Sequence, residues 1–418
     1  MDRCRGQPGA RVHAAGTRLM PAALLRATDK VAIIGVGTSR YARSRPGETF
    51  ISLAIDACVE ALRDAGLAPV DIDGLCGSHA PAAAVHVGLG IPHLTWWANP
   101  GTPFNIQLIE TVNAVAAGAC TTAIVYHSTW RLPNNSGSAA RDPMRVRMLE
   151  RGATPARPPI PALSPAVPGT MSGPVGYAAW AQRYFDVFGA GREDLARVAI
   201  NSRSWAAENP NAVMREPLSL DDYLSARMVR EPMCVYDMDV PIDGGDALVI
   251  TTTERAADLV ERPVIVHAAT NGLGGSPNED QCESFDHTGQ QVVARTLRER
   301  SEVSLRDCDL VMAYDGFSIL TLLWLESLGF CGRGEAPDFA RQHWDARRDR
   351  LMIDGRVPVN THGGSLSEGG TQGVGHVREA VHQLRGTAGP RQIANCRTAV
   401  LGLGAMLYNA GGAILRVE

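Results

Sequence analysis

Helix and strand patterns recur in the same order in the two parts of the chain. Residues 50–65 carry apolar side chains at helical spacing, and residues 72–75 after a short loop predict a strand. Later in the chain, residues 293–300 predict a helix and residues 310–313 predict a strand. An Asp-x-Asp sequence, at 71–73 and at 307–309, occupies an equivalent place at the start of both strands. The two segments therefore correspond in pattern and in the chemistry of the connecting loop.

A second pair of elements extends this correspondence. Residues 111–118 predict a helix of small residues, and residues 122–126 predict the strand that follows it. Residues 377–386 and 398–401 repeat that order in the second part of the chain. Two helix-to-strand pairs in one order indicate an internal duplication. Helices that alternate with apolar strands indicate layered α/β halves.

These patterns divide the chain into two halves, residues 29–255 and 256–418. The first half opens with KVAIIGVG (30–37), a buried-type strand whose glycines would suit a dinucleotide if a third glycine and a helix followed. Neither follows, so a dinucleotide site is disfavoured. The half closes with VYDMDVPIDGGDALVITT (235–252), which predicts a glycine turn and then a buried strand.

Two segments interrupt or precede this pattern. Residues 133–230 are irregular and rich in Pro, Asn, Arg and Ala, with a helical pattern at 176–188. Loops of such length usually have a role, so we expect this one to cover a binding face. Residues 1–28 are rich in Arg, Gly and Ala, and we expect a disordered extension there. A transit peptide and a start at Met20 are the alternatives.

The composition argues against several classes of function. The net charge of -4 and the lack of a basic run argue against a nucleic-acid partner. Lys30 is the only lysine, so a Schiff-base mechanism would depend on that residue alone. Nine cysteines without C-x-x-C or zinc-type spacing indicate no metal site and a reducing, cytoplasmic setting. No apolar run approaches the roughly 18 residues needed to span a membrane.

The stretch LMIDGRVPVNTHGGSLSEGGTQGVGH (351–376) resembles a segment of the thiolases. Thiolases read N-x-x-G-G-x-x-x-x-G-H-P there, and this chain supplies the asparagine and three glycines at 360, 363, 364 and 369. Gly370 stands where thiolases have the catalytic histidine, and Thr371 stands where they have the proline. The scaffold is thus similar, and its usual base is missing.

The resemblance to the thiolase superfamily runs from about Val31 to the C-terminus. It is strongest to sterol-carrier-protein-type thiolases, lipid-transfer proteins and steroid side-chain aldolases. The stretches that carry it are IDGGDALVITTTERAADL, AYDGFSILTLLWLESLGFCGRGEA, VPVNTHGGSLSEGG and TAVLGLGAMLYNAGGAILRV. The resemblance implies a thiolase-like α/β fold of two duplicated halves in a five-layered arrangement. It also implies a homodimer, for which the segment 111–126 is our candidate contact.

All four groups of thiolase chemistry are replaced in this chain. The nucleophilic cysteine, which requires a helix N-terminus, falls near Gly101 in NPGTPFN. The second cysteine falls near Val400, with Cys396 a few residues early in the preceding turn. The asparagine of the N-E-A-F motif falls on Tyr314, and the histidine falls on Gly370. A thiol relay at this site is therefore not expected.

Several polar side chains remain as candidates. Tyr314, at the position where steroid side-chain aldolases carry a tyrosine, could donate a proton to a substrate oxygen or accept one. Asp315 would orient it or cap the next helix, and His362 would lie near the thioester. His376 has a packing role in this interpretation. The second aldolase tyrosine, in E-A-Y-x-H-G, is lost in the corresponding stretch 368–373.

The remaining candidates bind the substrate. The glycines of the loop would let a thioester or pantetheine arm approach closely, and the polar residues would line the space that the lost histidine and tyrosine leave. The set comprises Asn360, Gly363, Gly364, Glu368, Gly370, Thr371, Gln372 and Gly101.

Three functions are compatible with these residues. The first is an acyl-CoA lyase that cleaves a β-hydroxyacyl-CoA by a retro-aldol reaction without a cysteine nucleophile. The second is an acyltransferase or thiolase of lipid metabolism that uses another thiol, with Cys76 and Cys120 nearest. The third is a non-catalytic acyl-CoA-binding or lipid-binding subunit. No cofactor is expected beyond the coenzyme A of the substrate. The aldolase resemblance also implies a small OB-fold partner protein.

Overall fold

Nine strands form one mixed sheet in the computed structural model, which describes residues 27–100, 104–130, 173–274, 284–405 and 409–418. The strand order is β3-β2-β4-β7-β1-β8-β14-β13-β9. The strands are β1 (Val31–Ala42), β2 (Gly74–Ser78), β3 (Trp96–Ala98), β4 (Thr122–Thr129), β7 (Asp243–Thr252), β8 (Val264–Gly272), β9 (Leu310–Ala313), β13 (Thr398–Leu403) and β14 (Ala410–Arg416). Short strands outside the sheet are β5 (Met228–Arg230), β6 (Met233–Cys234), β10 (Trp344–Asp345), β11 (Arg350–Ile353) and β12 (Val357–Pro358).

Helices connect and cover these strands. They are α1 (Phe50–Ala65), α2 (Ala82–Leu89), α3 (Phe104–Ala116), α5 (Gly173–Phe188), α6 (Arg192–Ala206), α7 (Leu220–Leu224), α8 (Thr253–Leu259), α9 (Gly289–Arg300), α10 (Ser318–Leu328), α11 (Ala336–Gln342) and α12 (Val374–Arg385). Among the described residues, no helix is both long enough and apolar enough to cross a membrane.

The two parts of the sheet have the same topology. In the first, β2 and β4 are parallel, and β7 and β1 continue the sheet antiparallel. In the second, β9 and β13 are parallel, and β14 and β8 continue it antiparallel. A short antiparallel pairing of β1 with β8 joins the two half-sheets. This repeated order matches the duplicated α/β fold predicted from the sequence.

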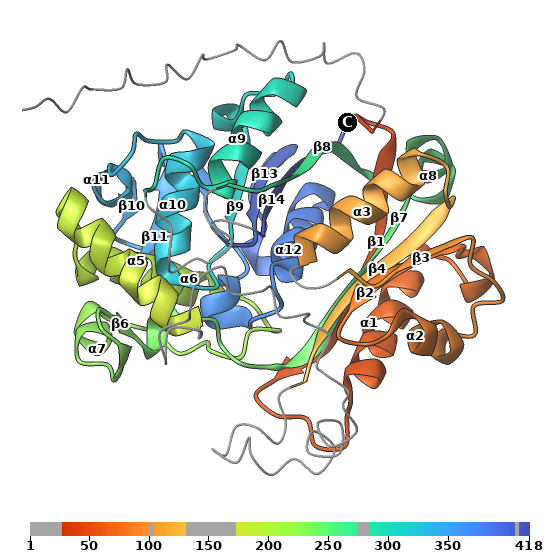
Figure 1. Ribbon diagram of the computed structural model, residues 1–418, viewed down its shortest axis with the longest axis horizontal. Helices are drawn as coiled ribbons and strands as arrows, with labels where there is room; N and C mark the ends of the chain where they lie inside the picture. Colours follow the sequence, from red (N-terminus) through yellow and green to blue (C-terminus); the bar gives the residue numbers. More distant parts are fainter. Residues whose placement is uncertain (1–26, 101–103, 131–172, 275–283, 406–408) are drawn as a thin grey trace, which may run out of the picture.

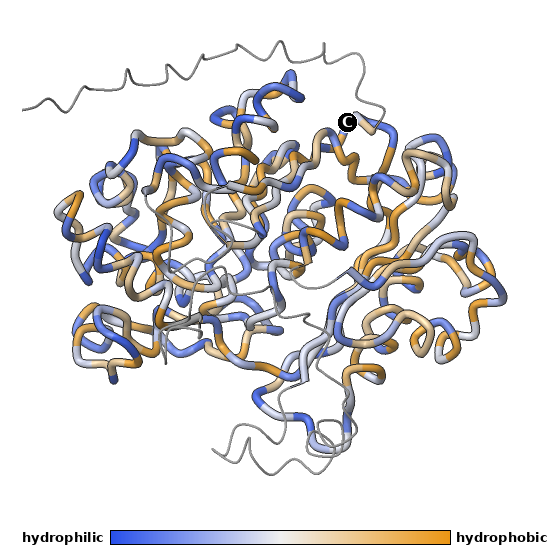
Figure 2. Tube along the Cα trace, viewed as in Figure 1, coloured by the Kyte–Doolittle hydropathy of each residue, from blue (hydrophilic) through white to orange (hydrophobic). Residues whose placement is uncertain are grey.

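Five layers result from the way the helices cover the half-sheets. Helices α3 and α12 contact strands of both half-sheets and lie between them, in the middle of Figure 1. Helix α1 covers the outer face of the first half-sheet, and α9 covers that of the second. Figure 2 shows hydrophobic residues along the strands beside these helices. The core between the half-sheets includes Val112 of α3, Val377 of α12 and Leu401 of β13.

Helix α1 illustrates how local sequence sets these layers. Thr49 and Ser52 form a capping box at its start, and Gly66 ends it in the left-handed conformation. Its buried side chains recur at helical spacing and face the sheet. Burial of this stripe fixes the helix on the outer face.

Two predictions about elements were wrong. The first concerns Gly244 and Gly245, which lie within β7 and do not form a turn. A Cβ on Gly244 would meet the Tyr41 ring at 2.6 Å, and a Cβ on Gly245 would meet two backbone oxygens at 3.1 Å. These glycines therefore allow close packing of a central strand.

The second concerns the segment 111–126, which is not available for a dimer contact. Its strand, β4, lies between β2 and β7 inside the sheet. Most of α3 is buried between the half-sheets. The edge of the first half-sheet is instead β3.

The predicted covering segment 133–230 is only partly described. Its helical pattern is confirmed as α5, and α6 and α7 follow where the sequence pattern indicated irregular structure. Residues 192–216 pack against the loop that precedes α12, where the Val213 and Met214 N–H groups donate to the Glu368 and Ser367 carbonyls. The expectation for residues 1–28 falls almost wholly outside the described residues.

Candidate active site

The loop before α12 is fixed to the end of β9 by Asn360. The side-chain amide of Asn360 accepts a hydrogen bond from the Ala313 N–H (2.8 Å) and donates one to the Ala313 carbonyl (2.7 Å). Its own N–H donates to the Val311 carbonyl (3.0 Å). Asn360 is buried and has a φ of 54°, a conformation that asparagine tolerates. Asn360, which was predicted to bind substrate, thus binds the backbone of β9 and fixes the position of the loop.

Asp315 is a second anchor of this loop. Its carboxylate accepts hydrogen bonds from the Ser365 N–H (2.7 Å) and the Ser202 hydroxyl (3.3 Å). It also pairs with Nε2 of His376 (3.1 Å). The helix that follows, α10, begins after Phe317 without a side-chain cap. Asp315 therefore holds the loop and a histidine, which corrects the predicted role as a helix cap.

Tyr314 lies beside that histidine at the end of β9. Its ring centroid is 5.7 Å from the ring of His376, and the side chain is 7% exposed. Its hydroxyl lies over Gly316, where a Cβ would overlap it. Glycine at 316 is thus needed for the hydroxyl to occupy this place. His376, predicted to have a packing role, connects Tyr314 to Asp315.

His362 completes a buried aromatic cluster. Its ring centroid is 4.5 Å from that of His376, with the planes at 75°. Its Nε2 lies 3.9 Å from Oε2 of Glu368. Burial, followed by the nearby positive charges, holds the pKa of His362 well below its usual value, so the ring is neutral at pH 7. A neutral imidazole can both donate and accept a proton.

Two atoms of this cluster have no hydrogen-bond partner among the described residues. They are Nδ1 of His362 and Oε2 of Glu368, and both side chains are about 1% exposed. Buried polar atoms usually have partners. Each of these atoms is therefore suited to a small polar group such as a water molecule or a substrate oxygen.

A buried charge network lies behind Glu368. The Arg378 guanidinium pairs with Glu368 and with Asp246 of β7, and it donates to the Tyr41 hydroxyl at 2.9 Å. Asn209 donates to Glu368 at 2.8 Å. Burial raises the pKa of Glu368, although Arg378 opposes the shift. The network ties strands of the first half to the loop of the second half.

The glycines of the loop provide space for the protein's own atoms. A Cβ on Gly363 would lie 2.6 Å from Ala206, and one on Gly364 would overlap the Asp315 carboxylate. Both glycines also have positive φ, at 99° and 60°. A Cβ on Gly370 would overlap the Asp239 carboxylate. Glycine is therefore needed at these positions to make room for neighbouring protein atoms, whereas the sequence analysis had explained it by the approach of a thioester.

The other residues predicted for the site differ in their burial and in whether the structure describes them. Thr371 is buried, and its hydroxyl accepts the Gly375 N–H at 3.4 Å, whereas Gln372 is partly exposed with a φ of 57°. Gly101 lies outside the described residues, just before α3 begins at Phe104. Cys396 lies before β13 as predicted, and Val400 is inside that strand.

Cysteine chemistry is not supported by the described thiols. Burial raises the pKa of both Cys76 and Cys120 to about 12. Every other cysteine in the described part of the chain also has a raised pKa, with burial as the largest cause. A thiolate is the reactive form of cysteine. These side chains are therefore poor nucleophiles.

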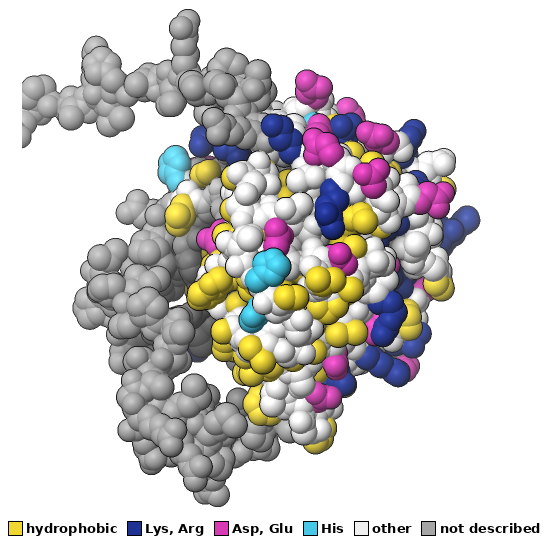
Figure 3. All heavy atoms as spheres, turned by 90° about the vertical axis from the view of Figure 1, so that its right-hand side faces the viewer, with side chains coloured by type: hydrophobic (Ala, Val, Ile, Leu, Met, Phe, Trp, Pro, Cys, Tyr) yellow, Lys and Arg dark blue, Asp and Glu magenta, His cyan; other side chains and the backbone are white. Residues whose placement is uncertain are grey.

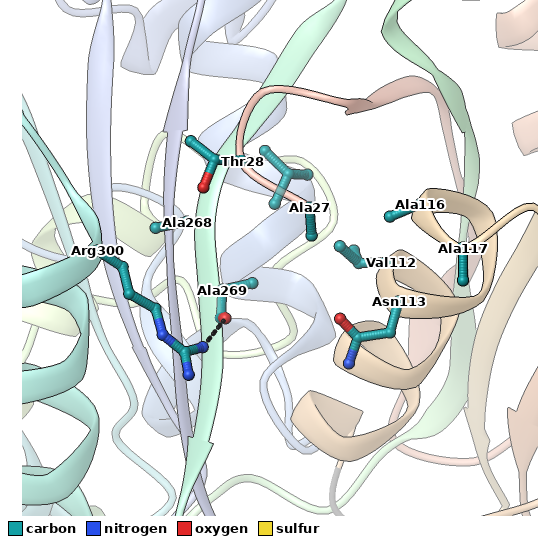
Figure 4. Close-up of a pocket in the computed structure, with 10 residues that line it drawn as sticks. Ala27, Thr28, Val112, Asn113, Ala116, Ala117, Ala268, Ala269 and Arg300 are labelled. Carbon is teal, nitrogen blue, oxygen red and sulfur yellow. Dashed lines mark hydrogen bonds between the residues drawn. The ribbon is translucent and has the colours of Figure 1, made fainter. Parts of the chain in front are cut away.

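Two cavities lie away from this cluster. One of about 360 Å³ lies between α3 and β8, where Figure 4 shows Val112 and Asn113 opposite Arg300. Arg300 donates to the Ala269 carbonyl at 3.5 Å there. Another of about 430 Å³ lies beside the end of α12. Neither is lined by residues of the candidate site. The described residues contain no cluster of His, Cys, Asp or Glu suited to a metal ion.

The chain is similar to known proteins over most of its length. Residues 276–417 match the family model described as thiolase C-terminal domain-like. The 17-hydroxy-3-oxo-4-pregnene-20-carboxyl-CoA lyase of Mycobacterium tuberculosis is 32% identical over 381 residues, which cover 86% of this chain and 93% of that protein. The steroid side-chain-cleaving aldolase of Thermomonospora curvata is 32% identical over 371 residues, covering 85% and 90%.

Solved structures agree with these relatives. The solved structure of an Ltp2-ChsH2(DUF35) aldolase superimposes with a TM-score of 0.79 at 29% identity, covering 93% of this chain and 98% of that one. A monomeric SCP2-thiolase-like protein type 1 from Mycobacterium smegmatis superimposes with a TM-score of 0.65 at 17% identity, covering 93% and 77%, which shows the fold alone.

Proposed function

Because the chain belongs to the thiolase superfamily, in the group of the steroid side-chain-cleaving aldolases, we propose that it is an acyl-CoA lyase. It cleaves the bond between Cα and Cβ of a β-hydroxyacyl-CoA by a retro-aldol reaction. The observation that carries this proposal is the cluster of Tyr314, His362 and His376 at a site with no usable thiol among the described residues. A steroid side chain is the proposed acyl class, after the names of the two relatives.

The proposed reaction needs one proton acceptor and one set of donors. The β-hydroxyl loses its proton, its electrons form the new C=O bond, and the Cα–Cβ bond breaks. The electrons pass to the thioester enolate, which then takes a proton at Cα. The products are a ketone and a shorter acyl-CoA, and the reaction needs no redox partner.

We assign two of these roles to the cluster. Tyr314 protonates the enolate or relays a proton to it, since a positioned phenol can serve as a general acid. The neutral His362 donates a hydrogen bond to the thioester oxygen as charge develops there. His376 packs against the Tyr314 ring and pairs with the Asp315 carboxylate. Asp315 and His376 thereby position Tyr314.

Acyl transfer is less well supported. Acetyl-CoA acetyltransferases are among the relatives, at 27% identity for the protein of Methanothermobacter thermautotrophicus. Their thiol chemistry would need a reactive cysteine, and burial keeps Cys76 and Cys120 protonated.

Two partners accompany this proposal. The solved aldolase is described by two protein names, Ltp2 and ChsH2(DUF35). We therefore propose that this chain also binds a small partner protein, which the sequence resemblance predicts to have an OB-fold. A second copy of the chain is the other partner. Its contact lies at the edge strand β3, where Trp97 is 61% exposed. Figure 3 shows hydrophobic side chains gathered on this face.

A substrate screen tests the proposed function. The chain, purified with any protein that binds it, is incubated with β-hydroxyacyl-CoAs that carry steroid, aromatic or aliphatic groups. Release of a ketone is measured before and after treatment with iodoacetamide. We expect turnover of at least one thioester that survives alkylation. Turnover abolished by alkylation, with protection by acyl-CoA, would support cysteine catalysis instead.

A further inference from the structure

By its likeness to the thiolase motif, Gly370 is predicted to stand where thiolases have the catalytic histidine, and the structure shows which side chain lies beside it. A Cβ added to Gly370 would overlap Oδ2 of Asp239 and would lie 2.9 Å from its Cγ. The carboxylate therefore lies where the first atoms of a histidine side chain would be. A side chain at 370 and a carboxylate at 239 exclude each other at their present positions.

The backbone around Asp239 connects the two loops of the candidate site. Its N–H donates to the Gly316 carbonyl at 2.9 Å, and Met238 forms an antiparallel bridge with Phe317. The next residue, Val240, donates to the Ser365 carbonyl at 2.9 Å and accepts the Gly370 N–H at 2.9 Å. Asp239 is thus held between the loop after β9, which contains Tyr314, and the glycine-rich loop before α12.

This pairing puts Asp239 on the same face as the Tyr314 hydroxyl. Residues opposite each other in an antiparallel pair direct their Cβ atoms to one face, about 4.5 to 5.5 Å apart. Asp239 is opposite Gly316, and the Tyr314 hydroxyl overlaps the Cβ position of Gly316. The carboxylate and the phenol therefore border the same space.

Asp239 differs from the other carboxylates nearby in its exposure. Asp315 accepts from backbone and side-chain donors, and Glu368 pairs with Arg378. Asp237, two residues before Asp239, accepts from the Tyr223 and Ser318 hydroxyls at 2.7 and 2.6 Å. All three are at most 1% exposed, whereas Asp239 is only partly buried. A substrate could therefore reach Asp239.

We propose that Asp239 is the general base of the retro-aldol reaction and replaces the histidine lost at Gly370. This inference rests on the proposed function. The carboxylate removes the proton of the β-hydroxyl, the C=O bond forms as the Cα–Cβ bond breaks, and the enolate receives a proton at Cα through Tyr314. The proton on Asp239 then passes to solvent or to Tyr314. The reaction therefore consumes no co-reactant.

Chemical rescue tests the role. On a β-hydroxyacyl-CoA that the wild type cleaves, Asp239→Asn and Asp239→Ala should lower kcat by about 100- to 10,000-fold with a small change in KM. Formate should restore at least about tenfold of the loss in Asp239→Ala, because the vacated space beside Gly370 admits a small carboxylate. The control is Asp237→Ala, which should lower Tm and show no rescue.

A steric test examines the geometry without any substrate. Gly370→Ala should lower Tm markedly in the wild type and much less in Asp239→Ala, because the overlap with the carboxylate is gone. Equal losses in both backgrounds would show that the carboxylate does not fill this place.

The outcomes separate the two proposals. If the wild type cleaves the substrate and Asp239→Asn keeps nearly full kcat, the assignment of Asp239 is overturned and the lyase function stands. If no β-hydroxyacyl-CoA is cleaved by the wild type, the proposed function fails and the role of Asp239 falls with it.

Discussion

The hydroxyl of Tyr314 lies at the end of a buried strand, so its removal tests chemistry with little disturbance of packing. Tyr314→Phe keeps the ring next to His376 and should lower kcat by about 100- to 10,000-fold, the usual range for a general acid or base. KM should change little. Steady-state kinetics on a β-hydroxyacyl-CoA that the wild type cleaves check this result.

Tyr184→Phe is the matched control for Tyr314→Phe. Its hydroxyl donates to Glu326 in the packing between α5 and α10, away from the site. We expect this variant to lower Tm and to keep kcat. If Tyr314→Phe behaves like Tyr184→Phe, the tyrosine at 314 only packs.

His362 gives the protein a pH-dependent stability. Its pKa in the folded protein lies well below the value of about 6.5 in the unfolded chain, chiefly because of burial. Its contribution is therefore complete above pH 6.5 and is lost as the pH falls below that value, since the unfolded chain binds a proton that the folded chain does not. The slope is about 1.4 kcal/mol per pH unit for one such group.

Urea unfolding at pH 7 and pH 5.5 measures this effect. The wild type should lose stability between these values, and His362→Asn should lose less. A remaining slope is expected from His382, whose pKa is lowered to about 4 by burial and by nearby Arg378. An unchanged slope in His362→Asn would contradict the assignment to His362.

At the level of single residues, the sequence grouped side chains that the structure brings together. The motif likeness grouped Tyr314, Asp315 and His362, and all three lie around His376. Their roles in catalysis stay a prediction. It did not identify Asp239, because the contact with Gly370 depends on how a distant segment threads between two loops. The pairing of His376 with Asp315 was missed because the position of His376 at the start of the following helix suggested a structural role.

The glycine loop before α12 is the element that brings these residues together. Gly364 and Gly355 both have positive φ, at 60° and 66°. A Cβ on Gly364 would overlap the Asp315 carboxylate, whereas a Cβ on Gly355 has open space around it. Gly355→Ala should therefore cost only about 1 to 2 kcal/mol of stability, from backbone strain.

Gly364→Ala should lower stability much more than Gly355→Ala and should also abolish turnover, because the anchor on Asp315 is displaced. Thermal unfolding of the two variants checks the difference. Similar Tm values would mean that the loop moves freely away from Asp315.

Elements with strong periodicity were the most predictable. The predicted helix 50–65 and strand 310–313 coincide with α1 and β9. The strand predicted at 72–75 begins only at Gly74, because Pro69–Asp71 form a 3-10 turn before it. The glycines at 244 and 245 misled the prediction because paired glycines indicate a turn more often than a crowded strand.

For the whole molecule, the homodimer remains a prediction. The exposed edge of β3 with Trp97 is our candidate contact. The wild type should have the mass of a dimer at micromolar concentrations by light scattering, and Trp97→Asp should weaken the association by at least about tenfold. Arg348→Asp, at an exposed site in the second half of the chain, is the control and should leave the mass unchanged. A wild-type monomer would exclude this contact.

The duplication was predictable because it depends on the order of elements, which local patterns record. The joining of the half-sheets by β1 and β8 was not, because that pairing brings together distant segments. The same holds for the network in which Arg378 pairs with Asp246 and Glu368 across the two halves. Tertiary contacts of this kind decide the chemistry of the site.

The most direct test of the central claim is the dependence of cleavage on free coenzyme A. Products from a β-hydroxyacyl-CoA are quantified by mass spectrometry with free coenzyme A added and with it removed. We predict equal amounts of ketone and shorter acyl-CoA at the same rate in both conditions, since a retro-aldol reaction consumes no thiol. Cleavage that occurs only with added coenzyme A would contradict the account and indicate thiolysis.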